Sequence, residues 1–230
     1  AGNHYFIDLD LLKEDGLLSA EDLQVCECVE DSQKVDYGAL YEQRLLLLEK
    51  AYSRFEKNEQ YEAFIEKNSW WLKDFALFMA LKNEFEQKPW TEWEEDIKFR
   101  KPEAIGKYSE KLKDIIDLHY FIQYEFYRQW EALHSYATKQ GVELIGDVPI
   151  YVPMDSADVW SAPEFFQLDE DRAPVVIAGC PPDAFSATGQ RWGNPIYDWK
   201  KMENDGFSWW IKRLQCAGSF FDTVRIDHFR

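Results

Sequence analysis

The sequence has little cysteine and little positive charge, and it lacks any long hydrophobic run. Its 26 lysines and arginines are outnumbered by 43 aspartates and glutamates, giving a formal net charge of −17 at pH 7. A surface this acidic repels phosphate backbones, so nucleic acid is excluded as a partner. No apolar stretch reaches about 18 residues and no signal-peptide pattern is present. The sequence therefore predicts a soluble protein without a membrane partner.

The four cysteines are Cys26, Cys28, Cys180 and Cys216. Only Cys26 and Cys28 are close in sequence, and a Cys-x-Cys pair with no second pair or neighbouring histidine is a poor zinc signal. We expect reduced thiols in a cytoplasmic protein. The sequence begins at Ala1 rather than at a methionine, which leaves a start further upstream open.

Aromatic residues, by contrast, are abundant. The chain of 230 residues holds 10 Trp, 12 Tyr and 16 Phe, and 46% of its residues are hydrophobic. This is ample for the core of one large domain or two small ones. Two interpretations of the aromatic surplus stay open: a richly aromatic core, or exposed rings that bind flat apolar ligands such as sugars.

A helical pattern runs from Tyr37 to about Arg100. Apolar residues recur at three- and four-residue spacing in two sets, Leu45, Leu48, Ala51 and Phe55, and then Trp71, Phe75, Phe78 and Met79. The second, aromatic set is more typical of a helix–helix core than of a ligand site. Upstream, Ser19 with Asp22 three residues later predicts a capped helix start.

Two strands are predicted, and each follows a helix. A long helix that ends at Gly141 leads into "VELIGDVPIYV", and the helical stretch "GFSWWIKRLQCAG" leads into "TVRID". A helix, a glycine turn and a near-continuous apolar run together indicate an α/β fold with buried parallel strands. The intervening segment, residues 153–206, is rich in Pro, Gly, Asp and Ser and is predicted to be a long functional loop.

Polar residues mark the ends of both predicted strands. Because alternate strand residues share a face, Arg225 and Asp227 lie side by side, and Asp147 occupies a comparable place in the other strand. A guanidinium near a carboxylate lowers the pKa of the carboxyl, which keeps Asp227 ionised as a nucleophile requires. A structural ion pair, with His228 as a packing residue and Asp147 as a turn former, is the alternative that the residues alone leave open.

Three motifs together resemble one known family. "GDVPIYVPMDSADVW", "GCPPDAFSATGQRWGNPIYDW" and "VRIDHFR" are similar to the amylomaltase, or 4-alpha-glucanotransferase, family of the α-amylase clan. The resemblance extends over essentially the whole chain. It implies a partial (β/α)₈ TIM-type barrel with large helical insertions. The implied segments are an early barrel part at 1–36, a helical insertion at 37–100, and central barrel strands at 101–230 that include the active-site loop 153–206.

The resemblance also implies an activity and a role for each candidate residue. The family transfers α-1,4-glucan segments between maltooligosaccharide donors and acceptors by a retaining mechanism, with no metal or organic cofactor. Asp227 matches the nucleophile and Arg225 the residue that orients it and keeps it charged. The substrate-binding positions implied are Asp147, His228, Gln190 and Trp192. Within their loop, Gly189 and Gly193 permit tight turns.

A retaining enzyme needs a second carboxyl group about 5 Å from the nucleophile. In the family this acid/base glutamate comes from a strand that follows the nucleophile strand, so the chain resembles the central part of the enzyme. We therefore expect this chain alone to be inactive. A hydrolase of the same clan and a non-catalytic glucan-binding module remain alternatives, and the sequence predicts no oligomeric state.

Overall fold

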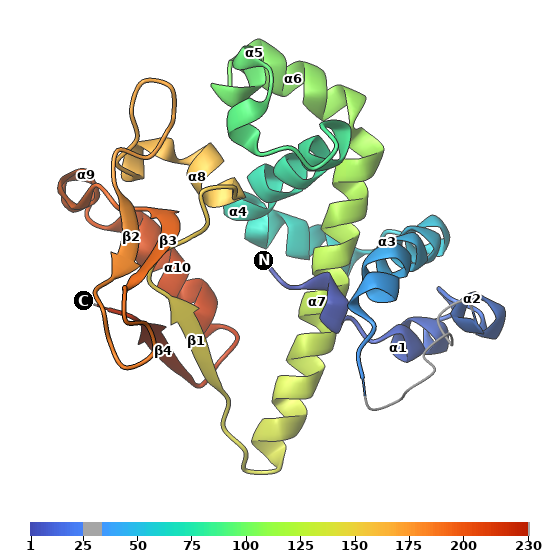
Figure 1. Cartoon of the computed structure of the whole chain (residues 1–230). Helices are drawn as coiled ribbons and strands as arrows, with labels where there is room; N and C mark the ends of the chain where they lie inside the picture. Colours follow the sequence, from blue (N-terminus) through green and yellow to red (C-terminus); the bar gives the residue numbers. More distant parts are fainter. Residues whose placement is uncertain (25–33, 230) are drawn as a thin grey trace. The chain divides into compact units, whose positions relative to one another are not determined.

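The computed structural model describes residues 1–24 and 34–229 (Figure 1). The chain forms two compact units. The N-terminal unit comprises Ala1–Ala76 with Lys113–Leu133, and the C-terminal unit comprises Leu77–Leu112 with His134–Arg230. The units group residues by contact rather than by a role in a barrel, so the predicted division at residues 36 and 100 stays a prediction. Cys26 and Cys28 lie outside the described residues.

The N-terminal unit is helical. Its elements are η1 (His4–Phe6), α1 (Leu9–Glu14), α2 (Ala20–Gln24), α3 (Tyr37–Arg54), and parts of the long helices α4 (Glu59–Glu84) and α7 (Lys113–Lys139). The predicted cap of α2 is confirmed: Asp22 donates its backbone N–H to the Ser19 hydroxyl, and the Ser19 N–H is bonded to the Asp22 carboxylate at 2.8 Å. This reciprocal pair satisfies two amides that the first helical turn leaves unpaired.

Aromatic rings form the core of this unit. Phe55 packs on Tyr61 and Phe121 with ring centroids 5.2 and 4.9 Å apart, and Trp71 stacks on Tyr127 at 5.9 Å. Such offset and edge-to-face pairs stabilise a core beyond the area that they bury. The interpretation of the aromatic stripe on α4 as helix–helix core is confirmed for Trp71.

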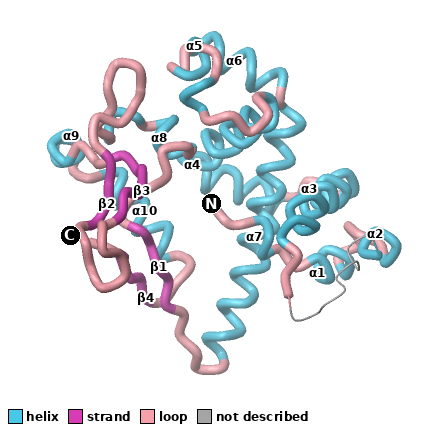
Figure 2. The backbone as a smooth tube through the Cα atoms, viewed as in Figure 1, coloured by secondary structure: helices cyan, strands magenta, loops and turns pink. Residues whose placement is uncertain are grey.

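The C-terminal unit carries the strands (Figure 2). Strands β1 (Ile145–Pro149) and β4 (Thr223–Asp227) pair in parallel, and β2 (Ile177–Cys180) and β3 (Gln190–Pro195) pair antiparallel. The helical elements are η2 (Trp90–Glu92), α5 (Glu95–Lys98), α6 (Pro102–Lys111), α8 (Ala157–Ser161), η3 (Pro163–Phe165), α9 (Trp199–Asn204) and α10 (Ser208–Gly218).

The structure corrects two expectations for this unit. Residues 153–206 are not a structureless loop, because they contain α8, η3, the β2–β3 hairpin and α9. The parallel strands are less buried than predicted: Ile145 is 73% exposed, and β4 alternates between exposed and half-buried residues. The physical reason is that β1 and β4 have only each other as hydrogen-bonded neighbours within the described residues.

Candidate active site

The parallel register of β1 and β4 brings the predicted carboxylates and the arginine together. Asp147 pairs with Arg225 across the ladder, and Pro149 pairs with Asp227. Because side chains two residues apart share a face, Asp147, Arg225 and Asp227 all lie on one side of this two-stranded sheet. The prediction that the two strands are parallel is confirmed, and the structure shows in addition that they are hydrogen-bonded neighbours.

Arg225 lies between two carboxylates, and it binds them unequally. Its Nε donates to Asp147 Oδ1 at 3.1 Å and its Nη2 to Asp147 Oδ2, a two-pronged ion pair. The same Nη2 lies 3.5 Å from Asp227 Oδ1. Arg225 therefore contacts Asp227, beside which strand alternation predicted it. Its closer partner is Asp147, because the strand register sets these two residues opposite each other.

His228 follows the nucleophile candidate directly and folds back on it. The residue has a left-handed backbone (φ 54°), a conformation that non-glycine residues adopt uncommonly and histidine more often than most. Its Nδ1 lies 2.6 Å from Asp227 Oδ2. Arg225 and His228 thus each face one oxygen of the Asp227 carboxylate.

The β2–β3 hairpin supplies the remaining two predicted residues. The Trp192 ring meets the His228 ring edge-on with centroids 4.9 Å apart, and Trp192 Nε1 donates to Gln190 Oε1 at 3.0 Å. The structure therefore joins all the predicted site residues in one series of contacts. The series runs through Asp147, Arg225, Asp227, His228, Trp192 and Gln190.

The electrostatics of the site follow from the arginine. The hydrogen bond from Arg225 lowers the pKa of the Asp147 carboxyl, and the same contact raises the pKa of Arg225. Both side chains are more than half exposed, at 51% and 64%. Solvent therefore screens the pair, and its value lies in orientation more than in stability.

The loop between β2 and β3 adds an aromatic side chain that the sequence analysis did not single out. Phe185 is 95% exposed at a turn where Asp183 Oδ1 accepts the backbone N–H groups of Phe185 and Ser186. Gly189 closes this loop with φ 72°, and a Cβ there would lie 2.6 Å from the Cys180 carbonyl oxygen. The requirement for glycine at this turn is thus confirmed. The sequence "DAF", with an aspartate two residues before a phenylalanine, was the available sign of a turn that exposes Phe185.

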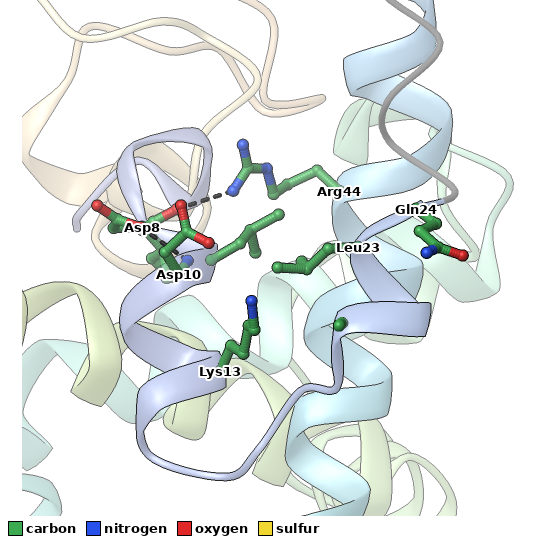
Figure 3. Close-up of a pocket in the computed structure, with 9 residues that line it drawn as sticks. Asp8, Asp10, Lys13, Leu23, Gln24 and Arg44 are labelled. Atoms are coloured by element: carbon green, nitrogen blue, oxygen red, sulfur yellow. Dashed lines mark hydrogen bonds between the residues drawn. The ribbon is translucent and has the colours of Figure 1, made fainter.

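A separate cavity of about 500 Å³ lies in the N-terminal unit, among α1, α2 and α3 (Figure 3). Two of its charged lining residues are engaged in the fold: the Asp8 carboxylate caps α1, and Arg44 Nη1 donates to the Ile7 carbonyl at 2.8 Å. None of the predicted site residues lines it. We therefore place the candidate active site at β1, β4 and the β2–β3 hairpin.

Two further features, a cluster of metal ligands and a membrane-spanning helix, are absent from the described part of the chain. No group of three or more His, Cys, Asp or Glu side chains gathers there in an arrangement suited to a metal ion. None of its helices is both long and apolar enough to span a membrane. Cys180 is a free thiol.

Comparison with known proteins gives consistent matches over the full chain. A family model described as 4-alpha-glucanotransferase matches residues 1–230. The 4-alpha-glucanotransferases of Clostridium butyricum and Thermus thermophilus are 46% and 45% identical to it over 233 and 236 residues. These alignments cover 100% of this chain and 48% and 46% of the two proteins.

A solved structure agrees with these relatives. Amylomaltase from Streptococcus agalactiae in complex with acarbose superposes with a TM-score of 0.94 at 44% identity, covering 100% of this chain and 47% of the other. The chain spans about half the length of the relatives that it matches. On the match of the family model to all 230 residues, the chain belongs to the 4-alpha-glucanotransferase family.

Proposed function

We propose that this chain carries the nucleophile part of a glucan-transferring active site, with Asp227 as the nucleophile. The observation that carries the proposal is the contact series that converges on its carboxylate, with Arg225 at one oxygen and His228 at the other. A carboxylate with a guanidinium at one oxygen and an imidazole nitrogen at the other is held in a fixed orientation, as a nucleophile requires. The two strands β1 and β4 then correspond to neighbouring strands of a (β/α)₈ barrel, whose active site lies at the carboxyl ends of its strands.

The chemistry is a double displacement. An oxygen of Asp227 forms a bond to the anomeric carbon of the donor glucan while the bond from that carbon to the leaving sugar oxygen breaks. The leaving oxygen takes a proton from a general acid. The 4-hydroxyl of an acceptor sugar then attacks the same carbon, gives its proton to the group that acted as the general acid, and displaces Asp227, so the α configuration is retained.

The neighbouring residues suit sugar recognition. Asp147 accepts hydrogen bonds from hydroxyl groups, Gln190 both donates and accepts, and Trp192 offers an apolar ring to the face of a pyranose. The substrates proposed are α-1,4-glucans or maltooligosaccharides, and acarbose, the compound bound by the Streptococcus agalactiae relative, is the corresponding probe. Asp147 and Gln190 are exposed to solvent, which suits the binding of a long glucan chain.

The general acid is not assigned to a residue of this chain. Retaining catalysis needs a second carboxyl about 5 Å from the nucleophile. Asp147, which shares its sheet face, is held in the ion pair with Arg225. We propose that the remaining half of the relatives' length supplies the acid/base, and that this chain by itself does not disproportionate maltotriose.

The test compares this chain with a longer polypeptide that contains it and the remaining length of its relatives. We expect the longer polypeptide to convert maltotriose to glucose and longer maltodextrins, and Asp227→Asn to lower the rate by on the order of 10⁴. The control Asp171→Asn, at an exposed turn, should keep the rate. An activated fluorinated glucosyl donor should label Asp227, as located by mass spectrometry of the peptides.

Three other results would count against the proposal. Formation of shorter sugars alone would indicate a hydrolase, and acarbose binding with no turnover would indicate a glucan-binding module. Full activity of Asp227→Asn would remove the nucleophile assignment. Acarbose binding itself should weaken in Trp192→Ala, with Trp70→Ala in the N-terminal unit as the control tryptophan substitution.

A further inference from the structure

We propose that Arg213 is a positioning residue that fixes the carboxyl end of β1 against the main chain of Asp227. Arg213 lies on α10, which leads into β4. Its Nη2 donates to the Pro149 carbonyl at 2.6 Å, and its Nη1 donates to the Ile150 carbonyl at 3.0 Å. Both acceptors are main-chain oxygens at the end of β1, whose last residue is Pro149.

The peptide group between Pro149 and Ile150 is also hydrogen-bonded to the main chain of Asp227. The Ile150 N–H donates to the Asp227 carbonyl oxygen at 3.2 Å. Ile150 is therefore held between the backbone of Asp227 and the guanidinium of Arg213. Because Asp147 lies three residues before Ile150 on the same segment, this contact also sets how far the Asp147 side chain lies from Asp227 along the strand.

Tyr197 completes the arrangement and makes it specific. This residue is fully buried, and its hydroxyl donates to the Ile150 carbonyl at 2.6 Å. Burial raises the pKa of Tyr197, so the hydroxyl stays protonated, and its single hydrogen is used on Ile150. Arg213 Nη1 is then the donor to the Tyr197 oxygen, at 3.1 Å. One guanidinium thus serves three acceptors, which a lysine ammonium cannot do in the same planar geometry.

Two indole rings hold the guanidinium in place. The Arg213 Cζ lies 5.4 Å from the Trp209 ring centroid and 4.8 Å from that of Trp210. Cation–π contacts at this range favour a fixed orientation of the charged group. Within the described residues, the hydrogen bonds of Arg213 go to Pro149, Ile150 and Tyr197 and not to a side chain of the contact series, so we infer that its influence on the reaction passes through the main chain of β1.

The catalytic consequence rests on the proposed function, whereas the structural consequence does not. Replacing Arg213 by Gln removes the guanidinium donor from the Pro149 carbonyl. The Ile150 carbonyl then keeps the Tyr197 hydroxyl as its donor. The end of β1 then moves more freely relative to Asp227. A hydrogen bond to a charged donor contributes enough that the loss corresponds to about tenfold in a local opening equilibrium.

The first experiment uses the full chain and does not depend on activity. Amide hydrogen exchange by NMR should show Ile150 exchanging about tenfold faster in Arg213→Gln, with the amides of α6 unchanged. The ring protons of His228, which lie near the Trp192 indole, should shift because ring-current effects report their relative position. Arg213→Lys should restore part of both signals, and Lys212→Gln on the same helix is the control.

The second experiment uses the longer polypeptide. Arg213→Gln should lower kcat about tenfold or more while KM changes less than threefold, because ground-state contacts with the sugar are kept. A uniform rise in exchange across the C-terminal unit, with no selective change at Ile150, would overturn the proposal in favour of a plain structural staple. An inactive wild-type enzyme with a selective change at Ile150 would instead contradict the proposed function and leave the positioning role standing.

Discussion

Lowering the pH should destabilise the N-terminal unit through His119, a histidine buried in α7. The side chain is 5% exposed, and its Nε2 has no hydrogen-bond partner among the described residues. Burial, followed by the charge of nearby His4, lowers the pKa of His119 from 6.5 to about 4. The folded chain therefore holds this imidazole neutral in a range where the unfolded chain protonates it.

The sign and the size follow from proton linkage. A histidine whose folded pKa is depressed contributes its full stability above the unfolded value of 6.5 and loses it as the pH falls toward the folded value of about 4. At about 1.4 kcal/mol per pKa unit, the free energy of unfolding should drop by about 2 kcal/mol between pH 8 and pH 5, and by about 3 kcal/mol at pH 4. Arg54 strongly lowers the pKa of the Asp22 carboxyl. The stability that this carboxyl contributes is therefore lost only in more acidic solution, as the pH falls below the unfolded value of 3.8.

Urea denaturation followed by circular dichroism at several pH values between 4 and 8 measures this loss. His119→Leu removes the titrating group together with an unpaired ring nitrogen, so its stability should depend on pH less than that of the wild type, by about 2 kcal/mol at pH 5. The control is His134→Gln, because His134 is part of the C-terminal unit and its Nε2 has a partner, Asp222 Oδ2, at 3.1 Å. Parallel pH profiles for the wild type and His119→Leu would refute the reasoning.

Three further predictions concern the strands and their support, and each is measured on the purified chain. Gly146→Ala should cost about 1–3 kcal/mol in urea denaturation, since its Cβ would lie 2.0 Å from a ring carbon of Phe221, and Phe221→Leu in the same chain should recover much of the loss. Lys82→Met should cost about 1–3 kcal/mol, because its buried ammonium serves two carbonyls and one partly exposed carboxylate, and an equal stability would contradict this. Arg225→Gln should raise the pKa of the Asp147 carboxyl toward 3.8 in a ¹³C NMR titration, and an unchanged titration would show that the ion pair does not form in solution.

Local signals in the sequence predicted two helix boundaries of this chain correctly. Ser19 and Asp22 indicated a helix start because a capping box depends only on residues three apart, and the structure shows both of its hydrogen bonds. Gly141 indicated the end of the long helix, and its φ of 73° is the left-handed value that favours glycine. Both features are decided within one turn of chain, so no knowledge of the fold was needed.

Features that depend on pairing between distant segments were not predictable. The sequence placed Arg225 beside Asp227 by strand alternation, yet the closest partner of Arg225 is Asp147, 78 residues away in sequence. The β2–β3 hairpin was hidden because β2 is only 4 residues long and β3 contains glycine, proline and polar residues rather than alternating apolar ones. Arg213 likewise showed no signal, because its acceptors are main-chain carbonyls that any sequence would provide.

The integrity of the site therefore depends on the register of β1 against β4, and this register is fixed at both ends of the pair. At the entry end, the Asp222 carboxylate accepts the Leu144 N–H at 2.8 Å, and at the exit end the Ile150 N–H donates to Asp227. A slip by one residue would send Asp147 to the opposite face of the sheet and separate it from Arg225. Two half-exposed strands hold little apolar area to prevent such a slip. The hydrogen bonds at the two ends therefore fix the register of this pair, whereas burial fixes the register of a core strand.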